Sequence, residues 1–456
     1  MKNKILYNYF FILFSIIPIS LLVGSAVSSI NILIISISFL IYLFYLKNWQ
    51  FLKNKNIQLL LILYCYFIFN SFISLDFNVG VARNFGFIQY ILFFIALNYF
   101  FYRYEKFSKI IFFWFLVVVV VFLDILFESY TGKNILGFGY GFHERIFSFF
   151  KDEPKVGGYM NCFYLIIVGY FFNIYNSKSL KIKYLIVIMS VLFLLSIFLT
   201  GERSNTIKAL IAFFIFFTLN KNFSIKEKII CFITPVLLFG VIYINSDYLK
   251  YRYGSLINKR LKINSTVNYV KKEIINIKNE NKIEISDEEK DNFNRSLGAN
   301  YLRLYLSSLR VVKNYPIFGV GNKNYRIVTC TKYSTESGGT VKYQLYKSQS
   351  SKEHEIFNSS YICNTHPHQI YFEFLSEHGI VGTLILLVIF FKLIFQILRG
   401  INFNQNNVQL GCIVYVILIF MPIIPSGSFF NNYTSTLFWI NFSLMFAINR
   451  NINIFK

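Results

Sequence analysis

The sequence predicts an all-α polytopic membrane protein, a transmembrane helical bundle of about 12 spans. The chain has 456 residues, of which 55% are hydrophobic, and Phe alone contributes 55. Apolar runs of roughly 17 to 20 residues recur along it, and a helix of that length crosses a hydrocarbon core of about 30 Å. Alternation of apolar and polar residues with period two is absent, which disfavours a β-barrel.

The apolar runs give the expected spans, in chain order. They lie near 8–26, 29–46, 57–75, 84–102, 109–128, 158–176, 183–200, 204–220, 227–246, 378–398, 408–425 and 431–448.

The placement of Lys and Arg predicts the orientation of these spans. If the N-terminus lies inside, every inside segment carries basic residues. The short outside loops then carry few, with Arg83 alone in one of them and Arg203 alone in another. This asymmetry satisfies the positive-inside rule, and an even number of spans leaves both termini in the cytoplasm. No cleavable signal peptide is evident, because the first apolar run is long enough to span and lacks a clean cleavage site.

Two outside segments are longer than the rest. One is 129–157, between two of the nine spans in 1–246, and the other is 247–377, which leads into 378–456 with the last three spans and a cytoplasmic C-terminus. A lysine-rich stretch at 256–294 reads as a mobile insertion, with a helical tendency at best in 265–290.

The formal net charge of +23 raises the question of a nucleic-acid partner. The basic residues sit mostly in short loops between apolar runs, where they act as orientation signals. We therefore expect membrane lipids as partners and no nucleic acid.

An amphipathic helix is predicted after Leu297, closed by Asn314-Tyr315-Pro316. Its apolar positions are Leu302, Tyr305, Leu306, Leu309 and Val312, and its polar positions are Asn300, Arg303, Ser307, Arg310 and Asn314. Such a helix can lie on the membrane surface or against the bundle.

Arg203 is the first candidate site residue, because it stands between two spans with almost no loop. Lys208 lies just over one helical turn further, nearer membrane depth. One reading pairs Arg203 with Glu202 or with lipid head groups. The functional reading makes it a cationic ligand of a diphosphate, to which Arg offers a planar two-pronged donor.

Three further arginines lie in the outer segments. Arg303 and Arg310 are seven residues apart and share a helix face, so they are either solvated or turned toward the same anion as Arg203. Arg145, in the 129–157 loop, is either an ordinary loop charge or a further substrate contact.

The segment Cys363–Gly382 holds three of the five histidines and runs directly into a span. Three readings compete for His366, His368 and the adjacent Gln369: a metal site, a helix cap, or substrate binding. A metal site would combine Cys363, His366 and His368, with His354 as an optional addition, but this spacing fits no standard zinc pattern. The favoured reading is a neutral His368 imidazole at a reacting hydroxyl, so that no metal and no cofactor are expected.

Two cysteines, Cys330 and Cys363, both lie in the large outer loop, whereas the other four lie in spans. If that loop faces an oxidising periplasm, the two are natural disulfide partners. Closing a loop of this size stabilises a protein by about 3 kcal/mol in the chain-entropy model. The bridge would anchor the insertion close to the two histidines.

These residues resemble the signature of the O-antigen ligase and polymerase superfamily. His368-Gln369, nine residues and then Gly379-Ile380-Val381-Gly382 is similar to its His motif, a His followed by Asn, Ser or Gln, nine residues, then Gly-x-x-Gly. The stretch from Arg303 through Gly321 is similar to the segment upstream of that motif, and Arg203 is similar to its membrane-edge arginine. The resemblance covers most of the chain, but the 256–294 insertion has no recognised counterpart in it.

The resemblance implies a metal-independent, inverting glycosyltransferase with its active site at the periplasmic face of the bacterial inner membrane. The donor would be a glycan on undecaprenyl diphosphate, and the acceptor either lipid A-core, for a ligase, or another lipid-linked glycan, for a polymerase. Arg203 and Arg303 would hold the diphosphate, and His368 would assist the acceptor hydroxyl.

Three rival functions come from other classes. A transporter or flippase of lipid-linked oligosaccharides suits about twelve spans, but matched halves and paired broken helices are not evident. A metal-dependent membrane transferase and a non-catalytic envelope scaffold are the others, and the scaffold leaves the Arg and His pattern without a role.

Overall fold

Each expected span overlaps a helix in the computed structural model. It describes residues 2–47, 49–139, 145–151, 153–175, 180–258, 263–278, 283–294, 296, 298–334, 341–344, 361–401, 406–422 and 424–456. Its helices up to residue 174 are α1 (Lys2–Ser15), α2 (Ile17–Val23), α3 (Ser25–Leu46), η1 (Gln50–Lys53), α4 (Lys55–Phe72), α5 (Phe77–Gly86), α6 (Ile88–Arg103), η2 (Glu105–Lys109), α7 (Ile110–Thr131), η3 (Ser148–Phe150) and α8 (Val156–Ile174).

The second part of the chain adds more helices and two short strands. They are α9 (Leu180–Leu199), α10 (Arg203–Leu219), α11 (Ile225–Asn245), α12 (Asp247–Asn258), α13 (Ile263–Lys278), α14 (Asp287–Asn294), α15 (Ala299–Asn314), α16 (Tyr325–Thr329), β1 (Thr331–Ser334), β2 (Val341–Gln344), α18 (Ile370–Gly400), α19 (Asn407–Ile419) and α20 (Asn432–Ala447).

Eight of the described helical stretches are long and apolar enough to cross a membrane, and the bent pair α1–α2 gives a ninth. The helices α10, α19 and α20 coincide with three more expected spans but have 17, 13 and 16 residues. A hydrocarbon core of about 30 Å needs about 20 helical residues, so a count of twelve stays a prediction.

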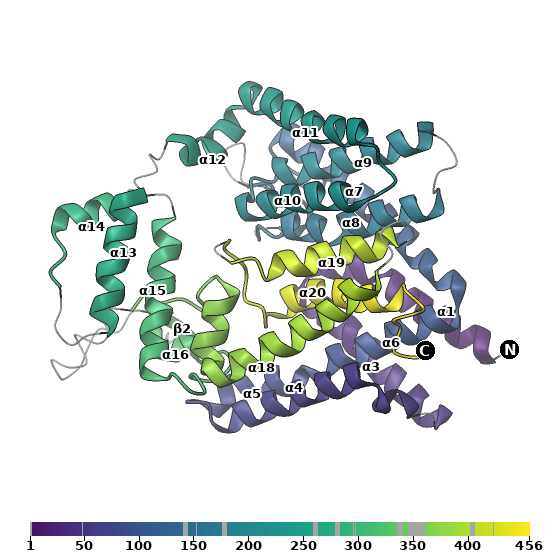
Figure 1. The fold of residues 1–456 in the computed structure, drawn as a ribbon, viewed down its shortest axis with the longest axis horizontal. Helices are drawn as coiled ribbons and strands as arrows, with labels where there is room; N and C mark the ends of the chain where they lie inside the picture. The colour runs from purple at the N-terminus through teal and green to yellow at the C-terminus, as the bar shows by residue number, and fades with distance from the viewer. Residues whose placement is uncertain are drawn as a thin grey trace.

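Three nearly buried helices, α8, α19 and α20, form the centre of the bundle. In Figure 1, α19 and α20 lie between the first helices of the chain and the group α7–α11. The helix α19 packs on α8 and α20, and α20 packs on α6 and α3. Trp439 in α20 is 1% exposed, whereas Leu185, Leu237 and Val388, on helices at the outside, are each more than 60% exposed. Apolar side chains facing outward on long helices are what a lipid environment requires.

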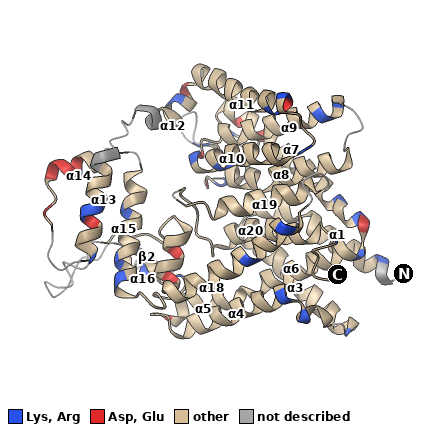
Figure 2. Cartoon of the chain, in the orientation of Figure 1, with Lys and Arg blue, Asp and Glu red and all other residues tan. Residues whose placement is uncertain are grey.

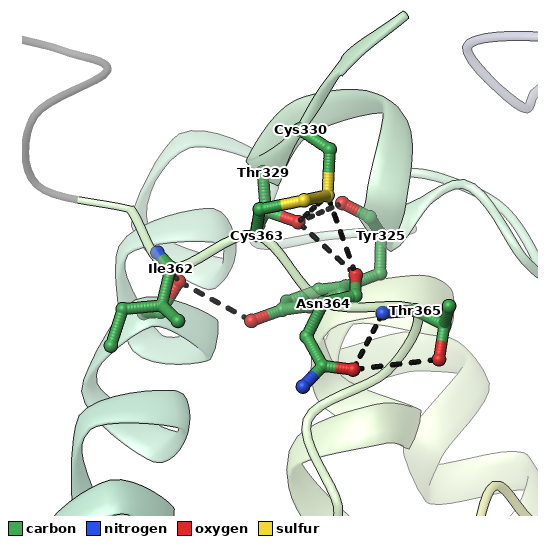
Figure 3. The surroundings of a disulfide bond; sticks show 8 residues. Tyr325, Thr329, Cys330, Ile362, Cys363, Asn364 and Thr365 are labelled. Atoms are coloured by element: carbon green, nitrogen blue, oxygen red, sulfur yellow. Dashed lines mark hydrogen bonds between the residues drawn. A yellow bond between two sulfur atoms is a disulfide. The ribbon is translucent and has the colours of Figure 1, made fainter. Parts of the chain in front are cut away.

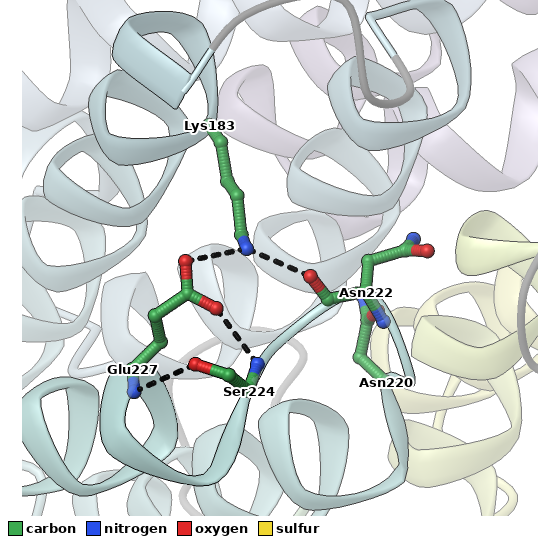
Figure 4. A network of polar contacts seen from close by, with 5 residues as sticks. All are labelled: Lys183, Asn220, Asn222, Ser224 and Glu227. Atoms are coloured by element: carbon green, nitrogen blue, oxygen red, sulfur yellow. Dashed lines mark hydrogen bonds and ion pairs between the residues drawn. The ribbon is translucent and has the colours of Figure 1, made fainter.

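Charged residues are sparse along the helices in the middle of this bundle (Figure 2). At one end of it, Lys183 donates to Glu227 Oε1 at 2.7 Å and to the carbonyl of Asn222 at 2.7 Å (Figure 4). Glu227 also forms a capping box with Ser224 at the start of α11. This network ties α9 to α11 through polar groups at the helix ends.

The helix α19 ends six residues earlier than the expected span 408–425. Pro422 and Pro425 follow it, and proline supplies no backbone N–H to continue a helix. Non-helical backbone therefore runs through 424–431 before α20 begins. Such backbone at membrane depth is tolerated where it is buried in protein or lines a cavity.

Most of the described part of the predicted insertion is helical, apart from residues 283–286. The helices α13 and α14 form a hairpin that packs against α15, and the rings of Tyr269 and Phe293 stack with centroids 4.0 Å apart. The helical tendency predicted for 265–290 is confirmed in 265–278 and 287–290, and the hairpin stands at the opposite end of the molecule from α1 and the C-terminus (Figure 1). Its mobility stays a prediction.

The amphipathic helix predicted before Pro316 is α15, but its buried face is rotated from the predicted one. Ser307, assigned to the polar face, is fully buried. Its Oγ accepts hydrogen bonds from the backbone N–H of Ile362 at 3.1 Å and from the Tyr325 hydroxyl at 3.3 Å. Chain from later in the large loop covers this face, which the helix pattern alone does not reveal.

A two-stranded ribbon is the departure from an all-α fold among the described residues. Strands β1 and β2 pair antiparallel, with Thr331 opposite Gln344 and Ser334 opposite Val341. The ribbon starts directly after Cys330.

Candidate functional site

Five of the sequence-predicted site residues line one cavity of about 500 Å³: Arg145, Arg203, Lys208, His366 and His368. Lys155 and Tyr301 are among the other residues that line it. The remaining walls come from the first turns of α8, from α19 and α20, and from the non-helical segment that joins α19 to α20. Residues far apart in the sequence therefore meet at one edge of the bundle.

Arg203 opens α10 and borders the cavity beside the helix α12. Its Nε donates to the backbone carbonyl of Arg252 at 2.7 Å, and Nη2 donates to the same oxygen. Tyr253 of α12 donates to the carbonyl of Phe198 at 2.9 Å, so α12 is fastened to the α9–α10 turn. The guanidinium is thereby held by the protein before any anion binds, which lowers the entropy lost on binding.

Glu202, next to Arg203, also lines the cavity and is 6% exposed. Its Oε1 accepts from the backbone N–H of Gly157 at 2.7 Å, and its Oε2 accepts from Asn205 Nδ2 at 2.6 Å. Burial raises the pKa of this carboxyl to about 7 against the opposing effect of these hydrogen bonds and of Arg145. Its charge therefore changes near neutral pH.

The segment that carries the two histidines is anchored by a disulfide between Cys330 and Cys363 (Figure 3). Their Cα atoms are 4.6 Å apart, and the sequence-predicted pairing is the one in the structure. Nearby, the Thr329 hydroxyl donates to the carbonyl of Asn364 at 3.4 Å. The bridge fixes the chain three residues before His366.

His366 and His368 stand next to each other, with ring centroids 4.1 Å apart. Burial lowers the pKa of His366 to about 3, assisted by the charges of His368, Arg83 and Arg326. Burial also lowers the pKa of His368. Both imidazoles are therefore neutral at physiological pH, and a neutral imidazole can accept a proton.

The backbone at His368 has a φ of 58°, in the left-handed region. Its carbonyl accepts from the N–H of Ser426 at 2.8 Å, which joins it to the segment after α19. That segment is fixed in turn by Glu373, whose carboxylate accepts from Ser428 Oγ at 2.5 Å and from the N–H of Phe429 at 2.8 Å. A strained residue at a cavity, held by its surroundings, is typical of functional sites.

The two glycines that follow the histidines have a packing role. Gly379 has a φ of 63° and interrupts the helical backbone of α18, and a Cβ there would clash with the carbonyl of Ile317. A Cβ on Gly382 would clash with the ring of Tyr66 in α4. The absence of side chains at both positions lets α18 bend and pack closely, which orients its first turn toward the cavity.

Three of the predicted site residues are not among those that line this cavity. Gln369 caps α18, with Oε1 accepting from the N–H groups of Tyr371 and Phe372 at 2.8 and 3.1 Å. The helix-cap reading therefore describes Gln369, while substrate binding by its side chain stays a prediction.

Arg303 and Arg310 project toward the α13–α14 hairpin. The guanidinium of Arg303 donates to Asn294, and it lies over the ring of Phe293 with Cζ 5.9 Å from the centroid. Arg310 forms an ion pair with Glu273 at 2.6 Å. The structure thus brings Arg145, Arg203, Lys208, His366 and His368 together and leaves these two arginines outside the cavity lining.

Sequence reasoning did not select Tyr301, Glu202 or the 426–431 segment as parts of the site. Tyr301 was in the expected amphipathic helix, and its ring faces that of His368 with centroids 6.1 Å apart. The run Pro425-Ser426-Gly427-Ser428, polar and flexible between two apolar stretches, was the available signal for the cavity wall.

The proposed metal ligands do not assemble in the part of the chain that the structure describes. Cys363 is in the disulfide, and His354 lies outside the described residues. No group of three or more potential ligating side chains occurs among the described ones.

Comparison with known proteins gives one family. Residues 188–387 match the family model described as O-antigen ligase, a stretch that includes Arg203, Arg303, both cavity histidines and the two glycines of α18. No curated protein matches the chain. Together with the apolar helices, the match indicates a multi-pass membrane protein whose residues 188–387 are similar to the O-antigen ligase family.

Proposed function

We propose that the protein transfers a glycan from an undecaprenyl-diphosphate carrier to a lipid-linked acceptor at the periplasmic face of the bacterial inner membrane. The observation that carries this proposal is that Arg203 and His368 line one cavity at the edge of the apolar bundle. A lipid-carried donor requires its reacting sugar at such an edge, since its chain stays in the membrane.

The cations of the cavity would hold the donor. Arg145, Arg203 and Lys208 surround a space that suits a diphosphate, and charge-assisted hydrogen bonds from Arg to phosphate are among the stronger ones in proteins. As the bond from sugar to diphosphate breaks, negative charge develops on the leaving oxygen. Cations fixed beforehand stabilise that charge without a metal ion.

His368 would receive the proton of the acceptor hydroxyl. The acceptor oxygen forms a bond to the anomeric carbon from the side opposite the diphosphate, the carbon–diphosphate bond breaks, and configuration inverts. The lowered pKa of His368 keeps the imidazole neutral and able to accept the proton. His366, beside it, would orient the ring or the acceptor.

The membrane orientation proposed for this reaction is the one predicted by the basic residues. Both termini would lie in the cytoplasm, and 247–377 would lie in the periplasm. The disulfide between Cys330 and Cys363 supports this placement, because disulfides persist in oxidising compartments.

The test is transfer by the full-length protein in liposomes that contain a lipid-linked glycan donor and an acceptor lipid. We expect Arg203→Ala and His368→Ala each to lower the rate by a hundredfold or more, since general base catalysis alone contributes about 10² to 10⁴. Arg450→Ala is the control, because this exposed arginine pairs with Glu105 and neither residue lines the cavity. Retention of the disulfide in each variant, read by mass spectrometry, shows that it folds.

Near-normal transfer by either site variant would contradict these roles. Movement of the donor across the bilayer with its glycan unchanged would instead support a flippase. Loss of transfer in the presence of a chelator would contradict metal independence.

A further inference from the structure

A second, smaller cavity of about 200 Å³ shares a wall with the first. Ser428, Phe429 and Asn431 line the first cavity, whereas Phe430, Asn432 and Ser435 line the second. Neighbouring residues of one segment therefore face two spaces. The proposed reaction needs two substrates, and the first cavity accounts for the donor.

Arg83 provides the positive charge of the second cavity. It lies in α5, is half-buried, and borders the cavity with Ser29, Gln89 and Asn432. Part of the cavity wall is apolar and includes Ile30 and Leu33 of α3, which are 55% and 43% exposed. A cationic side chain beside an apolar wall that is exposed on the outside of the bundle is the kind of surface that a lipid-linked anion requires.

Lys323 and Arg326 are held beside Arg83 by a clamp of buried asparagines. Asn322 Nδ2 donates to Asn84 Oδ1 at 2.7 Å, and Asn324 Oδ1 accepts from the N–H of Asp76 at 2.9 Å. The clamp fixes Lys323, between the two asparagines, in a left-handed backbone conformation with φ 66°. The close contact is possible because Gly80 has no side chain. A Cβ at this position would clash with the Asn322 carbonyl.

The three cations repel one another, and the two acids that face them lie buried in α18. Partial burial and the charges of Arg83 and Arg326 lower the pKa of Lys323. Glu377 and Glu373 of α18 face the cluster, but Glu373 is bound to Ser428 and Phe429. Among the described residues neither Arg83 nor Lys323 has an ion pair. An anion placed between them would relieve the repulsion.

We propose that Arg83, Lys323 and Arg326 form a second anion site, which takes the phosphate or diphosphate of the lipid-linked acceptor. This proposal rests on the proposed function. His366 lies within the field of Arg83 and Arg326 and beside His368, so an acceptor held at this cluster would present its sugar to the catalytic imidazole. The second cavity, which Arg83 borders and which Lys323 and Arg326 do not line, has room for a phosphate group, while the sugar would extend toward the larger cavity.

A kinetic experiment separates the two substrates. In the liposome assay, Arg83→Ala and Lys323→Ala are expected to raise the KM for the acceptor about tenfold or more, the value for loss of one charge-assisted hydrogen bond. The KM for the donor should stay within twofold. Arg203→Ala should show the reverse split, and Arg83→Lys should recover part of the acceptor affinity. Arg103→Ala, an exposed arginine at the far end of α6, is the matched control.

A binding experiment decides the proposal even without turnover. Native mass spectrometry of the full-length protein with undecaprenyl phosphate is expected to show two bound lipids in the wild type and one in Arg83→Ala. Phosphatidylglycerol at the same concentration should not fill the second site. If it does, the cluster holds an ordinary phospholipid and the proposal is wrong.

The two proposals fail in different ways. Wild-type protein that binds two prenyl phosphates but transfers no glycan contradicts the proposed function alone. Wild-type transfer with an unchanged acceptor KM in Arg83→Ala contradicts the second anion site alone, as does an equal rise in both KM values.

Discussion

The carboxylate of Glu202 accepts a hydrogen bond from the backbone N–H of Gly157 at 2.7 Å, inside the cavity that Arg203 borders. A Cβ on Gly157 would lie 2.9 Å from the Glu202 Cδ atom, so only glycine lets the two approach. This contact joins the start of α8 to the α9–α10 turn and buries an acid next to the cations of the site.

Stability should depend on pH through Glu202. Burial raises the pKa of its carboxyl in the folded state to about 7, above the unfolded value near 4.3. The folded state therefore binds the proton more tightly than the unfolded state. This proton adds on the order of 3 kcal/mol to the free energy of unfolding below about pH 4, and the contribution is lost as the pH rises through 7. Glu202→Gln should flatten the dependence of the thermal midpoint between pH 5 and 8. Glu105→Gln, an exposed side chain, should leave it unchanged, and an identical slope in Glu202→Gln would contradict the prediction.

Removal of the disulfide should loosen the histidine segment. Cys330 and Cys363 are 33 positions apart, and a bridge over a loop of this size stabilises by roughly 3 to 4 kcal/mol. Cys330→Ser with Cys363→Ser is expected to lower the thermal midpoint and to speed amide exchange around His366. Cys65→Ser, an exposed free thiol, is the control. Unchanged exchange in residues 361–370 would show that other contacts hold this segment.

Replacement of glycine by alanine should have opposite effects on stability at two positions. Gly382→Ala is expected to destabilise the protein by about 1 to 3 kcal/mol, because its Cβ would meet the Tyr66 ring and must displace α4 or α18. Gly240→Ala in α11, where nothing lies within 4 Å of the added Cβ, should stabilise by up to about 1 kcal/mol through helix propensity. Thermal unfolding in one detergent compares the two. Equal midpoints would mean that α18 adjusts freely.

The features that could be predicted from the sequence are those that depend on residues close together in the chain. Helical runs, the amphipathic helix before Pro316 and the cysteine pair follow from short patterns, and Arg203 and His368 stand out as polar residues at span edges. The position of Arg303 depended on residues that come earlier in the chain and fold back onto α15, and no local pattern reports such a contact. The early end of α19 was visible as Pro422 and Pro425, but the apolar residues around them outweighed this signal.

The ion pair between Arg310 and Glu273 should hold the α13–α14 hairpin on α15. Its two side chains are only 21% and 17% exposed, so water and salt screen it less than a surface pair, and a coupling energy of about 1 kcal/mol is expected. Glu273→Ala should therefore raise amide exchange in α13 about fivefold, and a double-mutant cycle with Arg310→Ala should recover the coupling. Lys290→Ala is the matched control within the hairpin, because its partner Asp287 is 98% exposed and the pair should contribute little. Equal exchange in the Glu273 and Lys290 variants would contradict the prediction, and the hairpin would then be held by the stacked rings of Tyr269 and Phe293.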